Sequence, residues 1–153
     1  MKRILISRPM PDSVATAARK FFDVEVRQKQ TPMSGAEMRA SLALYDAIIP
    51  TLGDRYAART FKDFSNPRYK ILANFGVGYN HIDIVAAQAA GICVTNTPGA
   101  VTAATADIAL MLILMSCRRA GEGERMVRSN RWEGWNPTQM LGQHVTGKTV
   151  GII

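Results

Sequence analysis

The pattern with the clearest chemical meaning is Gly76-Val77-Gly78, which follows the mostly apolar residues 71–75. Glycines leave the neighbouring backbone N–H groups uncovered, and such groups at the carboxyl end of a parallel strand can bind a carboxylate. A tight turn from a strand into a helix, with φ above zero at a glycine, would explain the same spacing. Because a single Gly-x-Gly is a weak signal, the spacing alone supports both interpretations equally.

Four further side chains could transfer protons or carry a functional charge. His81 follows the glycine turn and could act as an acid or a base, whereas His144 lies in a polar connecting segment and is expected to be exposed. Asp83 falls in the first turn of a predicted helix, where a carboxylate interacts favourably with the helix dipole. Asp107 lies inside an apolar helix, so we expect it to contact the backbone or an arginine rather than to take part in chemistry.

Composition and charge exclude several other classes of protein. The 153 residues are 47% apolar and 20% charged, as expected of a soluble globular domain. The net charge of +7 comes from 19 basic residues spread in ones and twos, so no nucleic-acid interface is predicted. Cys93 and Cys117 lack the spacing of a zinc site, and we expect buried free thiols and no metal. The short apolar run at residues 4–6 does not form a signal peptide, which favours a cytoplasmic location.

Strand-like and helix-like segments alternate along the first part of the chain and would position the candidate residues. Ser34 is followed three positions later by Glu37, which completes a capping box, and Gly91 is suited to end a helix. Strands separated by helices predict a parallel sheet with helices on both faces. Strands are predicted at residues 2–7, 23–28 (nearer a sheet edge), 46–50, 70–75 and 92–95, and helices at 11–22, from 34, at 55–64 and at 82–90.

A long apolar helix is predicted next, from a cap at Thr102 to about Arg119. Between residues 103 and 117 its only charge is Asp107, and apolar residues lie on every side, which is typical of a helix buried all round. Its apolar stretch is short for a membrane span. We therefore expect it to pack against its own chain on one side and a second domain or subunit on the other. Residues 121–143 follow as a polar connecting segment.

Residues 148–153 have the pattern of a strand that opens a dinucleotide-binding unit. Such a unit continues with a G-x-G-x-x-G turn, a helix that binds the pyrophosphate, and an acidic residue about 20 positions further on. Of these parts, the 153 residues hold only the strand.

With these motifs the chain resembles the D-isomer-specific 2-hydroxyacid dehydrogenases, especially the glyoxylate and hydroxypyruvate reductases. The resemblance covers residues 46–153 well and the first 45 residues in pattern only. It departs from the family at Asn80-His81, where Asp-Asn is frequent, and at Ala103, where an acidic residue is common. Because polar residues occupy the His81 position at a helix start in the family, we expect a surface or capping role for this histidine. Four motifs in the family's order carry the resemblance, at residues 76–83, 91–99, 101–107 and 147–153.

The resemblance implies an α/β fold with a flavodoxin-like parallel sheet. Residues 1–100 would form the substrate-binding domain, residues 101–146 a crossover and dimerisation helix with its connector, and residues 147–153 the first strand of a truncated nucleotide-binding domain. The resemblance also implies roles for individual residues. The backbone at Gly76, Val77 and Gly78 would bind the substrate carboxylate, Leu52 and Gly53 would border the same cleft, and Thr105 would approach the nicotinamide cofactor.

The implied activity is reversible hydride transfer between NAD or NADP and a small 2-oxoacid, with glyoxylate and hydroxypyruvate as leading candidates. The implied assembly is a homodimer through helix 102–119. The family's catalytic histidine, its acidic partner and the carboxylate-binding arginine have no counterpart here, so we expect this chain alone to be inactive and to bind no cofactor. A stand-alone anion-binding or oligomerisation module without catalysis is the alternative. A response-regulator-like domain is disfavoured because its acidic cluster is replaced by Ser7-Arg8 and Pro50-Thr51.

Overall fold

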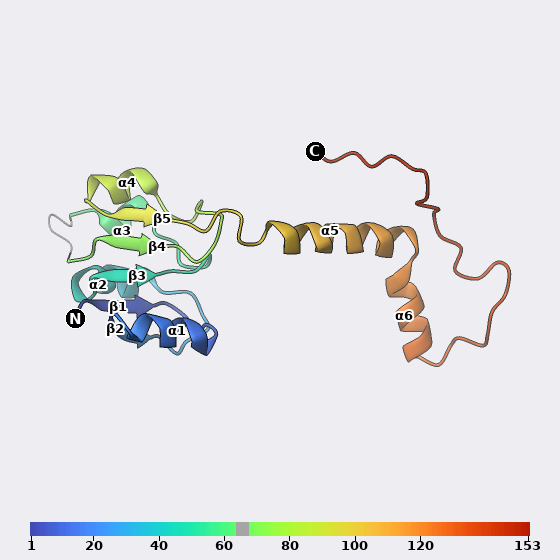
Figure 1. Ribbon diagram of the computed structural model, residues 1–153, viewed down its shortest axis with the longest axis horizontal. Helices are drawn as coiled ribbons and strands as arrows, with labels where there is room; N and C mark the ends of the chain where they lie inside the picture. The colour runs from blue at the N-terminus through green and yellow to red at the C-terminus, as the bar shows by residue number, and fades with distance from the viewer. Residues whose placement is uncertain (64–67) are drawn as a thin grey trace. The chain divides into compact units, whose positions relative to one another are not determined.

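The computed structural model describes residues 1–63 and 68–153. The chain divides into two compact units, Met1–Ala100 and Val101–Ile153 (Figure 1). The assignment of these stretches to a substrate-binding domain and a crossover helix stays a prediction. One predicted helix, at residues 55–64, ends on Phe64, which lies outside the described residues.

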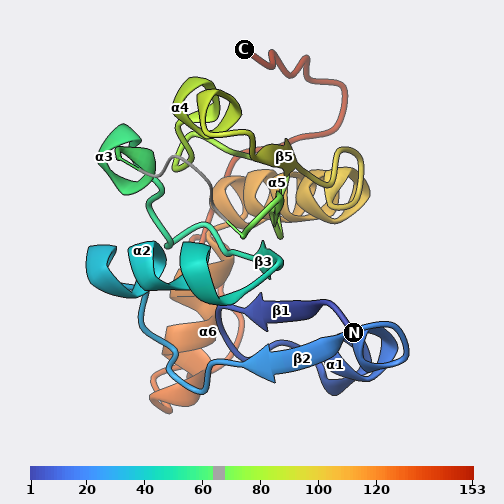
Figure 2. The same cartoon turned by 90° about the vertical axis from the view of Figure 1, so that its left-hand side faces the viewer.

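The first unit is built on a five-stranded sheet in which every pairing is parallel. Its order, β2-β1-β3-β4-β5, is the flavodoxin-like order, and Figure 2 shows the strands from β2 at the bottom to β5 at the top. The predicted α/β fold with a flavodoxin-like parallel sheet is confirmed, and the segment predicted to be nearer an edge is the edge strand β2. The strands are β1 (Arg3–Ile6), β2 (Asp23–Val26), β3 (Ala47–Ile49), β4 (Ile71–Ala73) and β5 (Cys93–Thr95).

The helices of this unit begin where the sequence supplies caps. Ser34 Oγ accepts from the Glu37 N–H at 3.2 Å, and the Glu37 carboxylate accepts from the Ser34 N–H at 2.8 Å, so the predicted capping box is confirmed. Gly91 adopts a φ of +74° just after the last helix, a conformation that favours glycine. The helices are α1 (Asp12–Arg19), α2 (Gly35–Leu44), α3 (Ala58–Phe61) and α4 (Ile84–Ala89).

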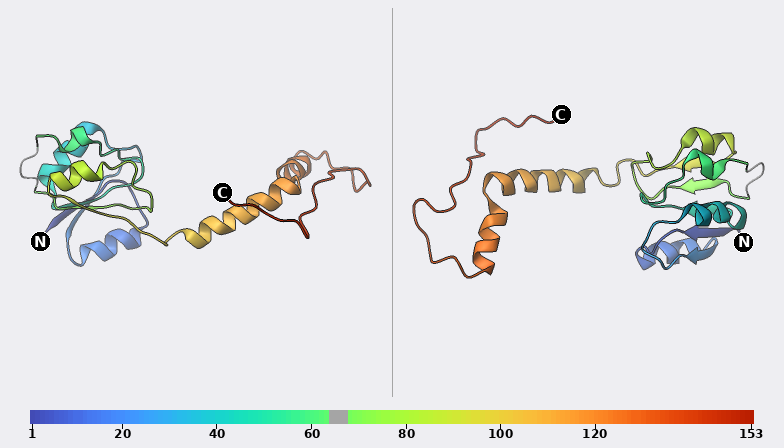
Figure 3. Two further views of the ribbon diagram at one scale, coloured as in Figure 1. Left: turned by 90° about the horizontal axis from the view of Figure 1, so that it is seen from above. Right: turned by 180° about the vertical axis from the view of Figure 1, so that it is seen from behind.

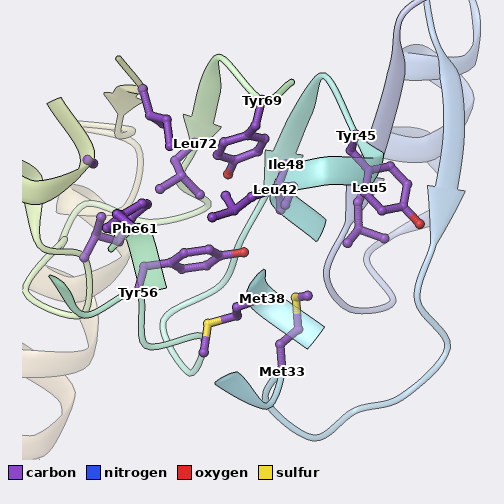
Figure 4. Close-up of a cluster of buried hydrophobic side chains, with 13 residues drawn as sticks. Leu5, Met33, Met38, Leu42, Tyr45, Ile48, Tyr56, Phe61, Tyr69 and Leu72 are labelled. Carbon is purple, nitrogen blue, oxygen red and sulfur yellow. The ribbon is translucent and has the colours of Figure 1, made fainter. Parts of the chain in front are cut away.

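The core lies on one face of the sheet (Figure 4). Leu5, Ile48 and Leu72 sit opposite one another in the strand register and are almost fully buried. Because side chains alternate along a strand, their neighbours point to the other face, where Ile4 and Ile6 of β1 are buried and Ile71 of β4 is 40% exposed. Cys93 also lies exposed in edge strand β5, and Cys117 is partly exposed, so both thiols are free but the predicted burial is wrong. The core consists of Leu5, Met33, Met38, Leu42, Tyr45, Ile48, Tyr56, Phe61, Tyr69, Leu72, Ile82, Ala87 and Ile92.

The second unit contains α5 (Thr102–Cys117) and α6 (Ala120–Arg128), which meet at Arg119 (Figure 3). Arg119 adopts left-handed backbone angles, φ 53° and ψ 36°, and this single residue turns the chain from one helix into the next. The segment predicted as a connector, residues 121–143, therefore starts as helix and continues as irregular chain. None of the residues from 147 to 153 lies in a strand. A parallel strand needs neighbours for its backbone groups, and the first unit's sheet does not include this segment.

α5 differs from the prediction at its N-terminus. Its N-cap is Val101, which makes no side-chain cap, so Thr102 is the first helical residue rather than the cap. None of its residues is buried within this unit, and the predicted burial all round, which requires a second domain or subunit, stays a prediction. Asp107 is consequently exposed instead of partnered in an apolar setting. Within residues 1–63 and 68–153, no helix is both long and apolar enough to cross a membrane.

Candidate carboxylate-binding site

The loops after β3 and β4 lie side by side at the carboxyl end of the sheet. A parallel bridge between Thr51 and Phe75 extends the pairing of these strands, and the Phe75 N–H donates to the Pro50 carbonyl at 3.0 Å. A Cβ added at Gly76 would lie 3.2 Å from Leu52 Cδ2. The structure therefore brings together two of the predicted site residues, Leu52 and Gly76, from separate strands.

The glycine turn has its own pattern of open and occupied backbone groups. The Gly76 N–H donates to the Asn74 carbonyl at 3.0 Å and is therefore engaged. From Val77 to His81, no backbone N–H has an acceptor in the described part of the chain. Of the predicted donors, Val77 and Gly78 are thus open to a ligand, and Gly76 is not.

The carbonyl groups of the same turn are all occupied. Asn74 Nδ2 donates to the Gly76 carbonyl at 3.1 Å and to the Gly78 carbonyl at 2.9 Å. The Gly76 carbonyl also accepts from the Thr97 N–H at 3.1 Å, and Asn96 Nδ2 donates to the Val77 carbonyl at 2.9 Å. A turn with engaged acceptors and open donors is suited to hold an anion.

The two glycines have different roles in the turn. Gly76 has a φ of +157°, and a side chain there would press on Leu52. Gly78 is outside the positive-φ region, and a Cβ added to it would meet nothing within 4 Å. The positive φ that the tight-turn interpretation requires is at Gly76, whereas the absence of a side chain at Gly78 keeps the adjoining N–H groups uncovered.

Asn74, which the sequence analysis did not select, is the buried support of this turn. It follows β4 and is 2% exposed. Its Oδ1 lies 3.1 Å from His81 Nε2, and partial burial lowers the pKa of His81. His81 therefore contacts the support of the site and is partly exposed, so it lies at the surface as predicted but does not cap the helix. Asp83 supplies the cap instead, because its carboxylate accepts from the Ala86 N–H at 2.9 Å at the start of α4.

Asp54 is the corresponding buried support of the loop after β3, and it too was missed. Its side chain is fully buried, and it accepts from the backbone N–H groups of Met33 and Thr51, each at 2.9 Å. The Ser7 hydroxyl donates to it, and Arg8 Nη2 lies 3.5 Å from its Oδ1. Burial acts to raise the pKa of Asp54, but these hydrogen bonds outweigh burial and lower it.

The guanidinium of Arg8 explains why the loop after β3 contains a glycine. A Cβ added at Gly53 would collide with Arg8 Nη2. The lack of a side chain at Gly53 therefore leaves room for the Arg8 guanidinium in its ion pair with Asp54. This packing positions the neighbouring Leu52 beside the glycine turn. A signal for Asn74 was present in the sequence, since it is a polar residue directly after an apolar strand segment, whereas Asp54 lies five residues beyond the end of β3 and had no such signal.

The exposed surroundings of the open N–H groups are mainly apolar. Leu52, Phe75, Val77 and Tyr79 are each between 39% and 61% exposed. Such a rim suits a small molecule with a carboxylate at one end and little bulk elsewhere. Thr105 is an exposed residue of α5 in the second unit, and its predicted role toward a cofactor stays a prediction.

The chain is similar to proteins of a known enzyme family. The family model for the D-isomer specific 2-hydroxyacid dehydrogenase catalytic domain matches residues 4–150. The chain belongs to this family. It is 38% identical over 151 residues to the glycerate dehydrogenase of Hyphomicrobium methylovorum, covering 99% of this chain and 47% of that enzyme. It is 37% identical over 155 residues to the glyoxylate reductase of Thermococcus onnurineus, covering 99% of this chain and 46% of that enzyme.

Solved structures of the dehydrogenase family share the fold. A structure from Polaromonas described as an NAD-binding D-isomer specific 2-hydroxyacid dehydrogenase superposes with a TM-score of 0.86 at 34% identity, over 96% of this chain and 46% of that one. An NADPH-dependent glyoxylate/hydroxypyruvate reductase from Sinorhizobium meliloti, in complex with NADP and malonate, gives a TM-score of 0.74 at 29% identity, over 97% of this chain and 44% of that one. The chain thus spans less than half the length of the relatives it matches.

Proposed function

We propose that this chain provides the substrate-binding part of an NAD- or NADP-dependent 2-hydroxyacid dehydrogenase that reduces glyoxylate or hydroxypyruvate. The backbone N–H groups of Val77 and Gly78, called here the carboxylate clamp, would bind the substrate carboxylate. The observation that carries the proposal is their open state beside occupied carbonyls at the end of β4. The names of the relatives, which are glycerate and glyoxylate enzymes, support the substrate class.

The clamp's contribution would be orientation rather than proton or hydride transfer. Two N–H groups on one carboxylate fix the direction of the adjoining carbonyl carbon, and the net charge of +7 favours the approach of an anion. The cofactor supplies the hydride when bound. Because the chain spans less than half the length of its relatives, we propose hydride transfer for the whole enzyme rather than for these residues.

A homodimer through residues 102–119 would account for the exposed apolar surface of α5. A two-fold contact between copies of this helix would cover side chains such as Leu110, Met111 and Leu114, which are now exposed. Light scattering at micromolar concentration should show a dimer that Met111→Arg dissociates and Met111→Leu preserves. A stable monomer of the unmodified chain would contradict this assembly.

The carboxylate clamp can be tested with the unreactive substrate analogue oxamate. In ¹⁵N NMR spectra of the 153-residue chain, oxamate should shift the amide signals of Val77 and Gly78 more than those of the rest of the first unit. Unchanged signals at both residues would contradict the clamp.

A chimera separates the dehydrogenase from the alternative, an anion-binding module without catalysis. Residues 1–146 of this chain would be joined to the remaining part of the Hyphomicrobium glycerate dehydrogenase. Oxidation of NADH or NADPH with glyoxylate or hydroxypyruvate by the chimera supports the dehydrogenase. Oxamate binding by a folded chimera without turnover of either substrate supports the binding module.

A further inference from the structure

We propose that Asn74 and Asn96 are positioning residues that orient the carboxylate clamp, and that His81 fixes the orientation of Asn74. This inference rests on the proposed function of the clamp. It concerns residues that do not touch the substrate but determine where the two donor groups point.

The orientation follows from the geometry of the peptide bond. In a trans peptide the carbonyl and the N–H point in opposite directions, and the described chain has no cis peptide. Asn74 and the Thr97 N–H hold the Gly76 carbonyl, so the N–H of Val77 on the same peptide points away from them. Asn96 holds the Val77 carbonyl, so the N–H of Gly78 points away from Asn96.

Without these amide donors the turn could rotate its peptide planes. An exposed loop carbonyl has water as an alternative partner. Without Asn96 the Val77 carbonyl has no other donor in the described chain, whereas without Asn74 the Gly76 carbonyl keeps only the Thr97 N–H. The open donors could then face one another's carbonyls or solvent. Two asparagines that donate to acceptors on successive peptides remove this freedom before a ligand arrives, and preorganised donors bind more tightly than donors that must rotate.

The orientation of the Asn74 side chain is fixed in turn by its surroundings. Only the amide nitrogen can donate, and it faces the carbonyls of Gly76 and Gly78, so Oδ1 must be the atom that faces His81. Nε2 of His81 is therefore the protonated nitrogen in this contact. Because Asn74 is 2% exposed, water cannot easily replace a partner that is lost.

The test uses oxamate and the 153-residue chain, with an asparagine of the same loop as the control. Asn80 is exposed and makes no hydrogen bond in the described part of the chain, so Asn80→Ala should leave oxamate affinity unchanged. Asn96→Ala should weaken oxamate binding roughly 5- to 30-fold, which corresponds to the loss of one or two hydrogen bonds. Asn74→Ala should weaken it at least as much.

Thermal unfolding separates positioning from a purely structural role. Asn96 is only partly buried, so Asn96→Ala should melt within a few degrees of Asn80→Ala while its affinity falls. This variant keeps the test valid if Asn74→Ala does not fold. In the active chimera, Asn96→Ala should raise KM for the oxoacid, with a smaller change in kcat and none in KM for the cofactor.

The outcomes distinguish this inference from the proposed function. If oxamate shifts Val77 and Gly78 in the unmodified chain but Asn96→Ala binds equally well, the clamp stands and the positioning role is overturned. If oxamate leaves both amides unchanged in the unmodified chain, the clamp and the positioning role are overturned together.

Discussion

The loops after β3 and β4 are neighbours with opposite chemistry. Each has a buried polar side chain behind it, Asp54 for the first and Asn74 for the second, and these side chains are 0% and 2% exposed. Asp54 accepts hydrogen bonds from backbone N–H groups. Asn74 donates hydrogen bonds to backbone carbonyls.

This difference shows how one buried side chain can determine what a loop offers to a ligand. In the loop after β3, Asp54 engages the Thr51 N–H, and the Asp54 N–H donates to the Thr51 carbonyl at 2.9 Å, but the Leu52 and Gly53 carbonyls have no donor in the described chain. A donor behind a loop engages the carbonyls and leaves the N–H groups open. The loop after β3 therefore presents open carbonyls beside its N–H groups, whereas the loop after β4 presents N–H groups beside occupied carbonyls and is the better suited to receive an anion.

The largest effect is expected when the acceptor in the first loop becomes a donor. Asp54→Asn would place amide hydrogens near the N–H groups of Met33 or Thr51 and leave the Arg8 guanidinium without its carboxylate. We expect the free energy of unfolding to fall by about 3 kcal/mol or more. Urea denaturation measures this free energy, and Asp107→Asn, at an exposed position, is the control. A loss below that of the control would show that the Asp54 network is not needed for stability.

The converse exchange should abolish the anion receptor. Asn74→Asp has the same shape but turns a carboxylate oxygen toward the carbonyls of Gly76 and Gly78, so we expect a loss of about 1–3 kcal/mol in unfolding free energy. The oxamate-dependent shifts at Val77 and Gly78 should disappear. Retained oxamate binding by a folded Asn74→Asp variant would contradict the comparison of the two loops.

Substitutions at the two glycines should separate turn geometry from ligand access. Gly76→Ala is expected to lower the unfolding free energy by about 1–2 kcal/mol, since its φ of +157° disfavours a side chain and Leu52 is close. Gly78→Val should change stability by less than about 0.5 kcal/mol, because the space is open, yet weaken oxamate binding by covering the adjoining N–H groups. Equal oxamate affinity for Gly78→Val and the unmodified chain would mean that the glycines serve only the turn.

The smallest effect concerns a carboxylate on the surface of α2. Hydrogen bonds from the Ser34 backbone and hydroxyl, with Lys29 and Arg27 nearby, lower the pKa of Glu37 from 4.5 to about 2. A lowered pKa gives stability that is present above pH 4.5 and is lost as the pH falls toward 2. Glu37→Gln should therefore be less stable than the unmodified chain at pH 6 but nearly equal to it close to pH 2. Urea midpoints at pH 6, 4 and 3 measure the change, and a constant difference would contradict it.

The sequence predicts the sheet and the position of the glycine turn because both depend on local patterns. Alternating strands and helices fix a parallel sheet, and Ser34 with Glu37 fixes the start of α2. The roles of Asn74 and Asp54 depend on partners far along the chain, such as Ser7 for Asp54, and no periodicity encodes them. Composition likewise shows that α5 needs cover but not which partner provides it, so the burial predicted for this helix stays a prediction.

The connection between β4 and β5 has a consequence for the order of folding. The Asn74 N–H donates to the Thr95 carbonyl, the Thr97 N–H donates to the Gly76 carbonyl, and Asn96 holds the Val77 carbonyl. β5 is the last strand of the sheet to be synthesised, and it joins at an edge. A nascent chain that has emerged only as far as α4 already contains Asn74 and the glycine turn, but it lacks Asn96 and Thr97, which complete the hold on the Val77 and Gly76 carbonyls. The binding loop therefore matures only when the final strand docks.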